Sequence, residues 1–94
     1  MKSYIVCCGT NGRAVLYGRC ETEPVAGQPI RLVDARMVLY WDRACGGLLG
    51  LAAKGPKGDT RITSAVPSHG DECVRQWLEC TPEAAAAIDA WTAA

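Results

Sequence analysis

The sequence predicts an α+β fold, a small and mostly antiparallel sheet with a short internal helix and a C-terminal helix. Three observations support this prediction. Several segments are dense in β-branched and aromatic residues, which favour strands. The pair Asn11–Gly12 is typical of the tight turn of a hairpin. Near the C-terminus, Thr81-Pro82-Glu83 has the composition of a helix start. A length of 94 residues indicates a single domain, residues 1–94.

The first part of the chain predicts a hairpin and then a long, interrupted strand. Strands are expected at Ser3–Cys8 and Ala14–Glu21, on either side of the Asn-Gly turn. A loop with two prolines and a glycine separates this hairpin from the longest apolar stretch, Ile30–Trp41. Charged residues interrupt that stretch near Asp34–Ala35, so we expect two strand segments joined there by a bulge or a tight corner.

The middle of the chain predicts a helix, a strand and a turn. Asp42 is expected to cap the helix or to form a turn. The leucines and alanines of Cys45–Lys54 have the spacing of a short buried helix, with the glycine pair Gly46-Gly47 at its start. A loop follows, because Gly and Pro punctuate the next residues. We then expect a strand over Thr60–Val66 and a turn over Pro67–Asp71.

The last part of the chain predicts a half-exposed strand and the C-terminal helix. Glu72–Cys80 alternates in polarity, as a strand with one buried face does. One face would hold Val74, Leu78 and Cys80, and the other Cys73, Arg75 and Trp77. Thr81 is the expected N-cap of a helix that continues to Trp91 and packs one face on the sheet.

Composition and charge argue against several classes of function. Ten basic and ten acidic residues cancel, so the chain lacks the excess positive charge of a nonspecific nucleic-acid binder. No apolar stretch approaches the roughly 18 residues of a membrane span. The N-terminal apolar run ends at Gly9, too early for the core of a signal peptide. We therefore expect a soluble, cytoplasmic protein with no membrane contact, whose six cysteines are free thiols in a reducing compartment.

No recognisable set of catalytic or metal-ligating residues occurs in the sequence. The single histidine, His69, lies in a polar segment that favours a surface turn. Cys73 follows it by four residues, a spacing that matches no established zinc site. The acidic residues are scattered along the sequence, and nothing in the sequence marks two of them as a catalytic pair. We expect no enzymatic activity, no metal and no cofactor.

The end of the long apolar stretch is the best candidate for a binding site. Aromatic faces stack on bases, and the free N–H groups at a helix N-terminus suit anions. Basic residues on the flanking segments would then surround a phosphate. The candidate ligand-binding residues are Tyr40, Trp41, Arg43, Gly46, Gly47, Lys54, Lys57 and Arg61. The alternative is that Trp41 belongs to the core and that the glycines only turn the chain.

Two parts of the chain, Arg31–Ala53 and Leu78–Ala84, resemble a family of small uncharacterised phage and prophage proteins. The features in common are the aromatic pair Tyr40-Trp41 at a strand end, a Leu/Ala helix over Leu48–Gly55, and a Cys-Thr-Pro-Glu-Ala helix start at Cys80. Small phage proteins of this size are similar in build to counter-defence proteins that oligomerise and sequester nucleotide immune signals. The resemblance therefore implies an accessory protein of this kind.

Two functional hypotheses follow. In the first, a non-enzymatic phage-type protein binds and sequesters a small anionic ligand, such as a nucleotide second messenger of host defence. In the alternative, the chain is a protein-interaction module, an inhibitor or adaptor that acts on a host protein, with Trp77 and Trp91 as candidate anchors. We also expect a homo-oligomer, because a 94-residue chain without Phe has little core of its own.

Overall fold

The computed structural model describes all 94 residues and confirms the α+β fold, with a six-stranded sheet and two α-helices. In chain order the elements are β1 (Lys2–Cys8), β2 (Ala14–Cys20), β3 (Ile30–Tyr40), the 3₁₀ helix η1 (Arg43–Cys45), α1 (Gly47–Lys54), β4 (Arg61–Ile62), β5 (Val66–Asp71), β6 (Val74–Glu79) and α2 (Pro82–Ala90). The predicted hairpin, internal helix and C-terminal helix are all present.

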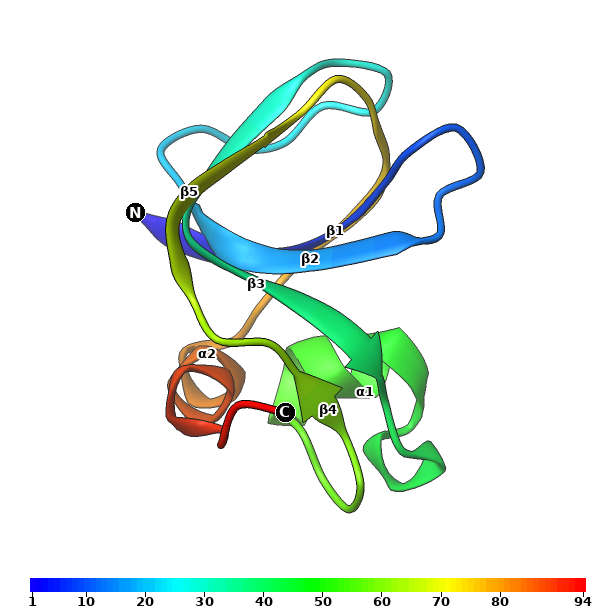
Figure 1. The fold of residues 1–94 in the computed structure, drawn as a ribbon, viewed down its shortest axis with the longest axis vertical. Helices are drawn as coiled ribbons and strands as arrows, with labels where there is room; N and C mark the ends of the chain where they lie inside the picture. The colour runs from blue at the N-terminus through cyan, green and yellow to red at the C-terminus, as the bar shows by residue number, and fades with distance from the viewer.

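The sheet is antiparallel throughout, in the order β4-β3-β2-β1-β6, and β5 also pairs with β3. The long strand β3 changes partner along one edge, because its first half pairs with β5 and its last residues pair with β4. β5 crosses over β1 and β2, so the sheet curls toward a partly closed barrel (Figure 1). The two α-helices lie together on the outside of this curl (Figure 1).

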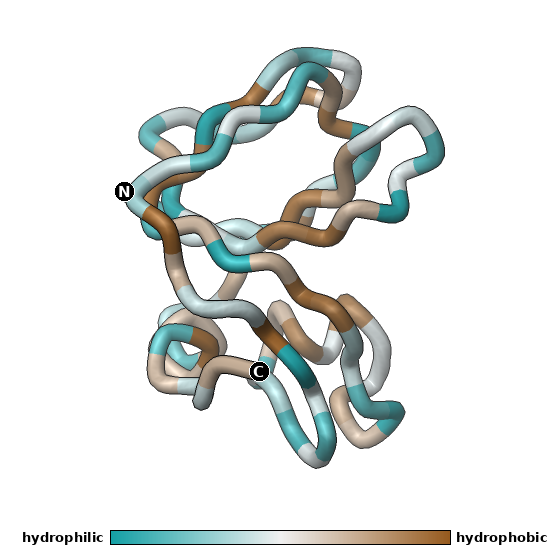
Figure 2. Tube along the Cα trace, in the orientation of Figure 1, coloured by the Kyte–Doolittle hydropathy of each residue, from teal (hydrophilic) through white to brown (hydrophobic).

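Both faces of the curled sheet carry buried residues. The inner cluster, inside the curl, contains Tyr4, Val6, Cys8, Leu16, Ile30, Leu32, Ala35 and Val74. The outer cluster lies between the sheet and the helices and includes Ile5, Tyr17, Leu51 and Ile88. Because successive residues of a strand point to opposite faces, the central strand β1 is buried on both sides. In Figure 2, brown hydrophobic segments recur along the strands, interrupted by teal ones, and the loops are mostly white or teal.

β3 contains the bulge that the sequence predicts at Asp34–Ala35. The register between β2 and β3 shifts at this point, so that β3 has one extra residue. Asp34 has a φ of 51°, and it is the only non-glycine residue with a positive φ. On the opposite strand, a Cβ atom at Gly18 would lie 2.8 Å from the Cβ of Leu32. The bulge and the close approach at this glycine together bend the sheet.

The helical segments begin at the caps that the sequence predicts. Oδ1 of Asp42 accepts the N–H of Ala44 at 2.9 Å and caps η1, which leads into α1. The hydroxyl of Thr81 accepts the N–H of Ala84 at 3.0 Å and caps α2. No helix in the structure has the length and the apolar composition needed to cross a membrane.

Two predictions for the segment before β6 are wrong. Thr60–Val66 does not form one strand, since β4 comprises only Arg61–Ile62. The predicted turn Pro67–Asp71 belongs to strand β5. This segment has weak strand propensity, but its backbone pairs with the first half of β3, and tertiary pairing overrides local preference. Pro67 is tolerated because β5 pairs with β3 alone and so lies at an edge.

The predicted assignment of faces in β6 is also wrong. Alternation predicts Val74 and Leu78 on one face, but Val74 lies in the inner cluster and Leu78 in the outer cluster. The register with β1 shifts near the start of β6, and this bulge reverses the alternation. Trp77 is partly buried against the inner cluster, and its ring meets that of Tyr4 edge to face at 5.8 Å between centroids.

Arg36 connects α2 to the sheet. This side chain is only 5% exposed and has no acidic partner. Its Nε donates to the carbonyl of Thr63 at 2.6 Å, and its Nη atoms donate to the carbonyls of Ile88 and Trp91. A cation at the C-terminal end of a helix is favourable. Trp91 Nε1 in turn donates to the carbonyl of Thr60 at 2.8 Å, so this predicted interface anchor is part of the fold.

Candidate binding surface

The predicted anion site lies at one end of the sheet, where β3 leads through η1 into α1. Tyr40 and Arg61 are cross-strand neighbours on β3 and β4, and both are exposed. Trp41 packs partly buried against the outer cluster, as the core alternative expects. Arg43 is exposed on η1. The structure therefore brings Tyr40 and Arg61 together and turns Trp41 toward the helices.

The carboxylate of Asp42 accepts hydrogen bonds from two backbone N–H groups of this segment. Its Oδ1 accepts the N–H of Ala44 at 2.9 Å, and its Oδ2 accepts the N–H of Asp59 at 3.0 Å. These two hydrogen bonds, and then the nearby Arg43 guanidinium, hold the pKa of the Asp42 carboxyl below its ordinary value. The chain's own carboxylate thus occupies donors that would otherwise attract an anion.

The glycine pair and the following loop are fixed by local contacts. Gly46 and Gly47 have φ values of 81° and 75°, so both serve the turn into α1. The thiol of Cys45 accepts the N–H of Lys57 at 3.3 Å and lies 3.2 Å from Oγ1 of Thr60. This contact fastens the loop before β4 to η1.

The eight candidate residues do not line a common hollow. Arg43 lies before α1, whereas Lys54 lies in its last turn. Lys57 follows on the loop toward β4. None of the five best-defined hollows on the molecule is lined by any of the eight. The structure therefore spreads the predicted cations around the end of the sheet and does not gather them about one cavity.

A different surface stands out along β3, on the same end of the molecule. We define the β3 surface as Met37, Leu39, Tyr40, Arg61 and Val66. Its four apolar members are among only seven large hydrophobic residues that the molecule exposes. Met37 and Val66 line one cavity, Leu39 lies between Met37 and Tyr40 on β3, and Tyr40 pairs with Arg61 on β4.

A small cavity of about 100 Å³ opens beside the β3 surface. Its walls come from β2, β3, β5 and the loop between β4 and β5, and they are Leu16, Ala35, Arg36, Met37, Thr63, Ser64, Val66 and His69. Two hydrogen bonds between Met37 and Thr63 hold the wall of the cavity: Met37 N donates to the hydroxyl oxygen Oγ1 of Thr63 at 2.9 Å, and Thr63 N donates to Met37 O at 2.9 Å. His69, predicted in a turn, is in fact part of this wall on β5.

Sequence reasoning missed the β3 surface because a continuous apolar run predicts a buried strand and not an exposed surface. Met37–Trp41 is apolar without interruption, which is typical of a strand covered on both faces. The helices cover one face of β3 here, but its pairing with β2 ends at Met37 and its register with β4 shifts between Val38 and Tyr40. Leu39 is left 55% exposed as a result. The sequence did carry one sign of this surface. A strand with one covered face needs an apolar residue only at every second position, whereas Met37–Trp41 is apolar at every position.

The sequence matches one family model, described as a domain of unknown function (DUF6948), over residues 1–88. The chain belongs to this family. The DUF6948 match spans all six strands and most of α2, so the β3 surface lies wholly within it. No curated protein and no solved structure matches the chain.

Proposed function

We propose that this DUF6948 domain works without catalysis, as a protein-interaction module whose binding surface is the β3 surface. One observation carries the proposal: four of the seven exposed large hydrophobic residues lie together on β3 and β5. Small domains seldom leave connected apolar side chains in water unless a partner covers them. The module acts as an inhibitor or adaptor of another protein.

The composition of the β3 surface supports this proposal. Aromatic residues, Met and Arg are enriched at protein interfaces, whereas Lys and Glu are depleted there. Tyr and Arg are also the residues that most often dominate binding energy. Tyr40 and Arg61 stand side by side, and the apolar residues Met37 and Leu39 precede them on the strand. An aliphatic side chain of the partner would enter the neighbouring cavity.

Affinity capture from bacterial lysate tests the proposal with matched variants. Leu39→Asp places a charge on the β3 surface, and Leu49→Asp places the same charge on the exposed face of α1, where Leu49 is 74% exposed. We expect the native chain and Leu49→Asp to retain the same stoichiometric partner and Leu39→Asp to lose it. A partner that Leu39→Asp still binds, or no stoichiometric partner at all, contradicts the proposal.

The second candidate is capture of a small anion, such as a nucleotide second messenger, by a phage-type counter-defence protein in the host cytosol. It is favoured by the start of α1, where Gly46 provides no side-chain cap and leaves first-turn N–H groups for an anion beside Arg43. Calorimetry with cyclic nucleotides and ADP-ribose derivatives tests this candidate. Binding that Arg43→Gln weakens supports it, and the absence of heat with every compound rules it out.

A further inference from the structure

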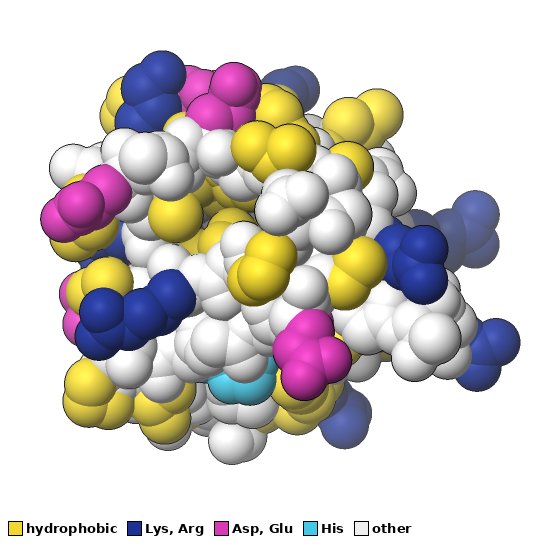
Figure 3. Space-filling view, turned by 90° about the horizontal axis from the view of Figure 1, so that it is seen from above, with side chains coloured by type: hydrophobic (Ala, Val, Ile, Leu, Met, Phe, Trp, Pro, Cys, Tyr) yellow, Lys and Arg dark blue, Asp and Glu magenta, His cyan; other side chains and the backbone are white.

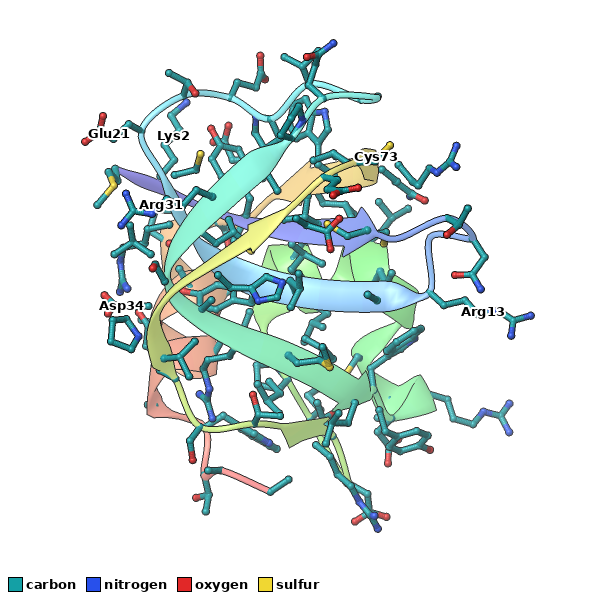
Figure 4. All side chains as sticks on the ribbon, turned by 45° about the horizontal axis from the view of Figure 1, so that its top comes forward. Lys2, Arg13, Glu21, Arg31, Asp34 and Cys73 are labelled. Atoms are coloured by element: carbon teal, nitrogen blue, oxygen red, sulfur yellow. The ribbon has the colours of Figure 1, made fainter.

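A second region of interest lies at the opposite end of β1, away from the β3 surface. A hollow of about 520 Å³ is lined by Met1, Lys2, Tyr4, Glu21 and Glu23. Lys2 and Glu21 stand close together at this corner, with Arg31 nearby (Figure 4). The end of the molecule that holds the loop between β2 and β3 is seen in Figure 3, where hydrophobic side chains surround a depression and both acidic and basic side chains stand around it.

Tyr4 is the unusual member of this hollow. It is 97% buried, since only 3% of its surface is exposed, and its ring is held against Trp77. Tyr17, which is likewise buried, bonds through its hydroxyl to Ala85 O and Asp89 Oδ1. No hydrogen bond within the protein involves the Tyr4 hydroxyl, and because every buried polar side-chain atom has a partner, this hydroxyl is open to solvent at the hollow that Tyr4 lines.

The charges around this hydroxyl are of both signs, because Lys2 lines the hollow together with Glu21 and Glu23. Burial, and then the Glu79 and Glu23 carboxylates, raise the pKa of the Tyr4 hydroxyl more than Lys2 lowers it, so it stays neutral and its oxygen can accept a hydrogen bond. Lys2 is paired with Glu79 at 3.3 Å, whereas Glu21 and Glu23 form no ion pair. Two carboxylates are therefore left for a ligand.

We propose that this hollow binds an alkylammonium or guanidinium group, with its N–H bonds directed to the Tyr4 hydroxyl oxygen and to the carboxylates of Glu21 and Glu23. Such a group supplies several donors and a positive charge, which is what this set of acceptors lacks. A bare metal ion does not fit, because no three potential metal ligands of the protein converge. The same cation occurs in free polyamines and in the Lys and Arg side chains of a partner protein.

The chain of such a ligand has a place to lie. A second hollow of about 430 Å³ shares Met1, Glu21 and Glu23 with the first, so the two are neighbours. Its walls include Pro24, Val25, Pro29, Ile30 and Val33. An alkyl chain packed along these apolar residues would leave its charged end at Tyr4.

Titration of the ¹⁵N-labelled chain by NMR tests the proposal with four probes. They are butylammonium, spermidine, a capped tripeptide with a central Lys, and tetramethylammonium, which has the charge but no N–H donor. We expect saturable shifts at residues 2–4 and 21–25 with the first three probes and weaker binding of tetramethylammonium. Tighter binding of the tripeptide than of the amines would assign the cation to a protein partner, and tighter binding of the amines would assign it to free polyamines.

Matched variants distinguish specific binding in the hollow from nonspecific attraction between charges. Tyr4→Phe keeps the ring and removes only the unpartnered hydroxyl, so the fold should be intact, and affinity should fall about two- to tenfold, the worth of one hydrogen bond. Glu23→Gln should weaken binding at least as much, and Glu72→Gln, on the turn before β6, should leave it unchanged. The proposal is overturned by the absence of saturable shifts with all probes, by full affinity in both Tyr4→Phe and Glu23→Gln, or by an equal loss in Glu72→Gln.

Discussion

At the scale of single residues, the six thiols differ in exposure and in acidity. Cys20 and Cys73 are partly exposed, whereas the other four are buried. Burial is the main cause that raises the pKa of Cys8 to about 11 and that of Cys80 to about 12. Because the thiolate is the reactive form, iodoacetamide at pH 8 should label Cys20 and Cys73 well before the others. Mass spectrometry of the native chain checks this order, and fast labelling of Cys8 or Cys80, or two disulfides, would contradict it.

Two glycines with a positive φ differ in how closely their surroundings are packed. Gly27 and Gly55 both have a positive φ, 84° and 92°. A Cβ at Gly27 would meet nothing within 4 Å, whereas one at Gly55 would lie 2.8 Å from the Cβ of Ala87 on α2. Gly27→Ala should cost about 1 kcal/mol for the conformation alone, and Gly55→Ala about 2–4 kcal/mol, because its φ of 92° and ψ of 179° suit only glycine and because overpacking is added. Urea denaturation measures both, and equal losses would show that α1 and α2 do not pack this closely.

At the scale of elements, the attachment of α2 depends on Arg36. Its removal leaves the partly buried carbonyls of Thr63 and Trp91 without a donor, and the buried carbonyl of Ile88 keeps only the N–H of Trp91. Arg36→Met, which keeps much of the volume, should lower the free energy of unfolding by about 3–5 kcal/mol. Arg13→Ala, at the exposed tip of the β1–β2 hairpin, should change it by less than about 0.5 kcal/mol. Urea denaturation compares the two, and a loss below about 1 kcal/mol for Arg36→Met would contradict this role.

Local signals predicted those elements that local chemistry determines. The Asn-Gly turn, the Asp42 and Thr81 caps and the bulge at Asp34 each depend on residues close in sequence, and each is present. β5 could not be predicted, because its residues are weak strand formers and it exists by pairing with the distant β3. The faces of β6 also escaped prediction, since a single bulge opposite β1 reverses the alternation.

At the scale of the whole molecule, the site residues predicted from the sequence and the β3 surface lie at the same end of the fold but are largely different residues. Tyr40 and Arg61 belong to the β3 surface, and Trp41, Gly46 and Gly47 serve packing or the turn. Whether the end of a strand is exposed depends on where the neighbouring strands of the sheet end. The hydrophobic periodicity of the sequence does not show this. The homo-oligomer stays a prediction. Tyr4 already packs against the Trp77 ring within one chain, so Trp77 needs no second copy to cover it.

The most direct measurement of the central claim is photocrosslinking from the β3 surface in living bacterial cells. A benzophenone amino acid is placed at position 39 in one variant and at position 49 in a second, since both leucines are exposed but only Leu39 lies on the β3 surface. We predict one discrete crosslinked product that contains a different protein, formed from position 39 and not from position 49. Equal products from both positions, no product from position 39, or a product made only of two copies of this chain would contradict the account.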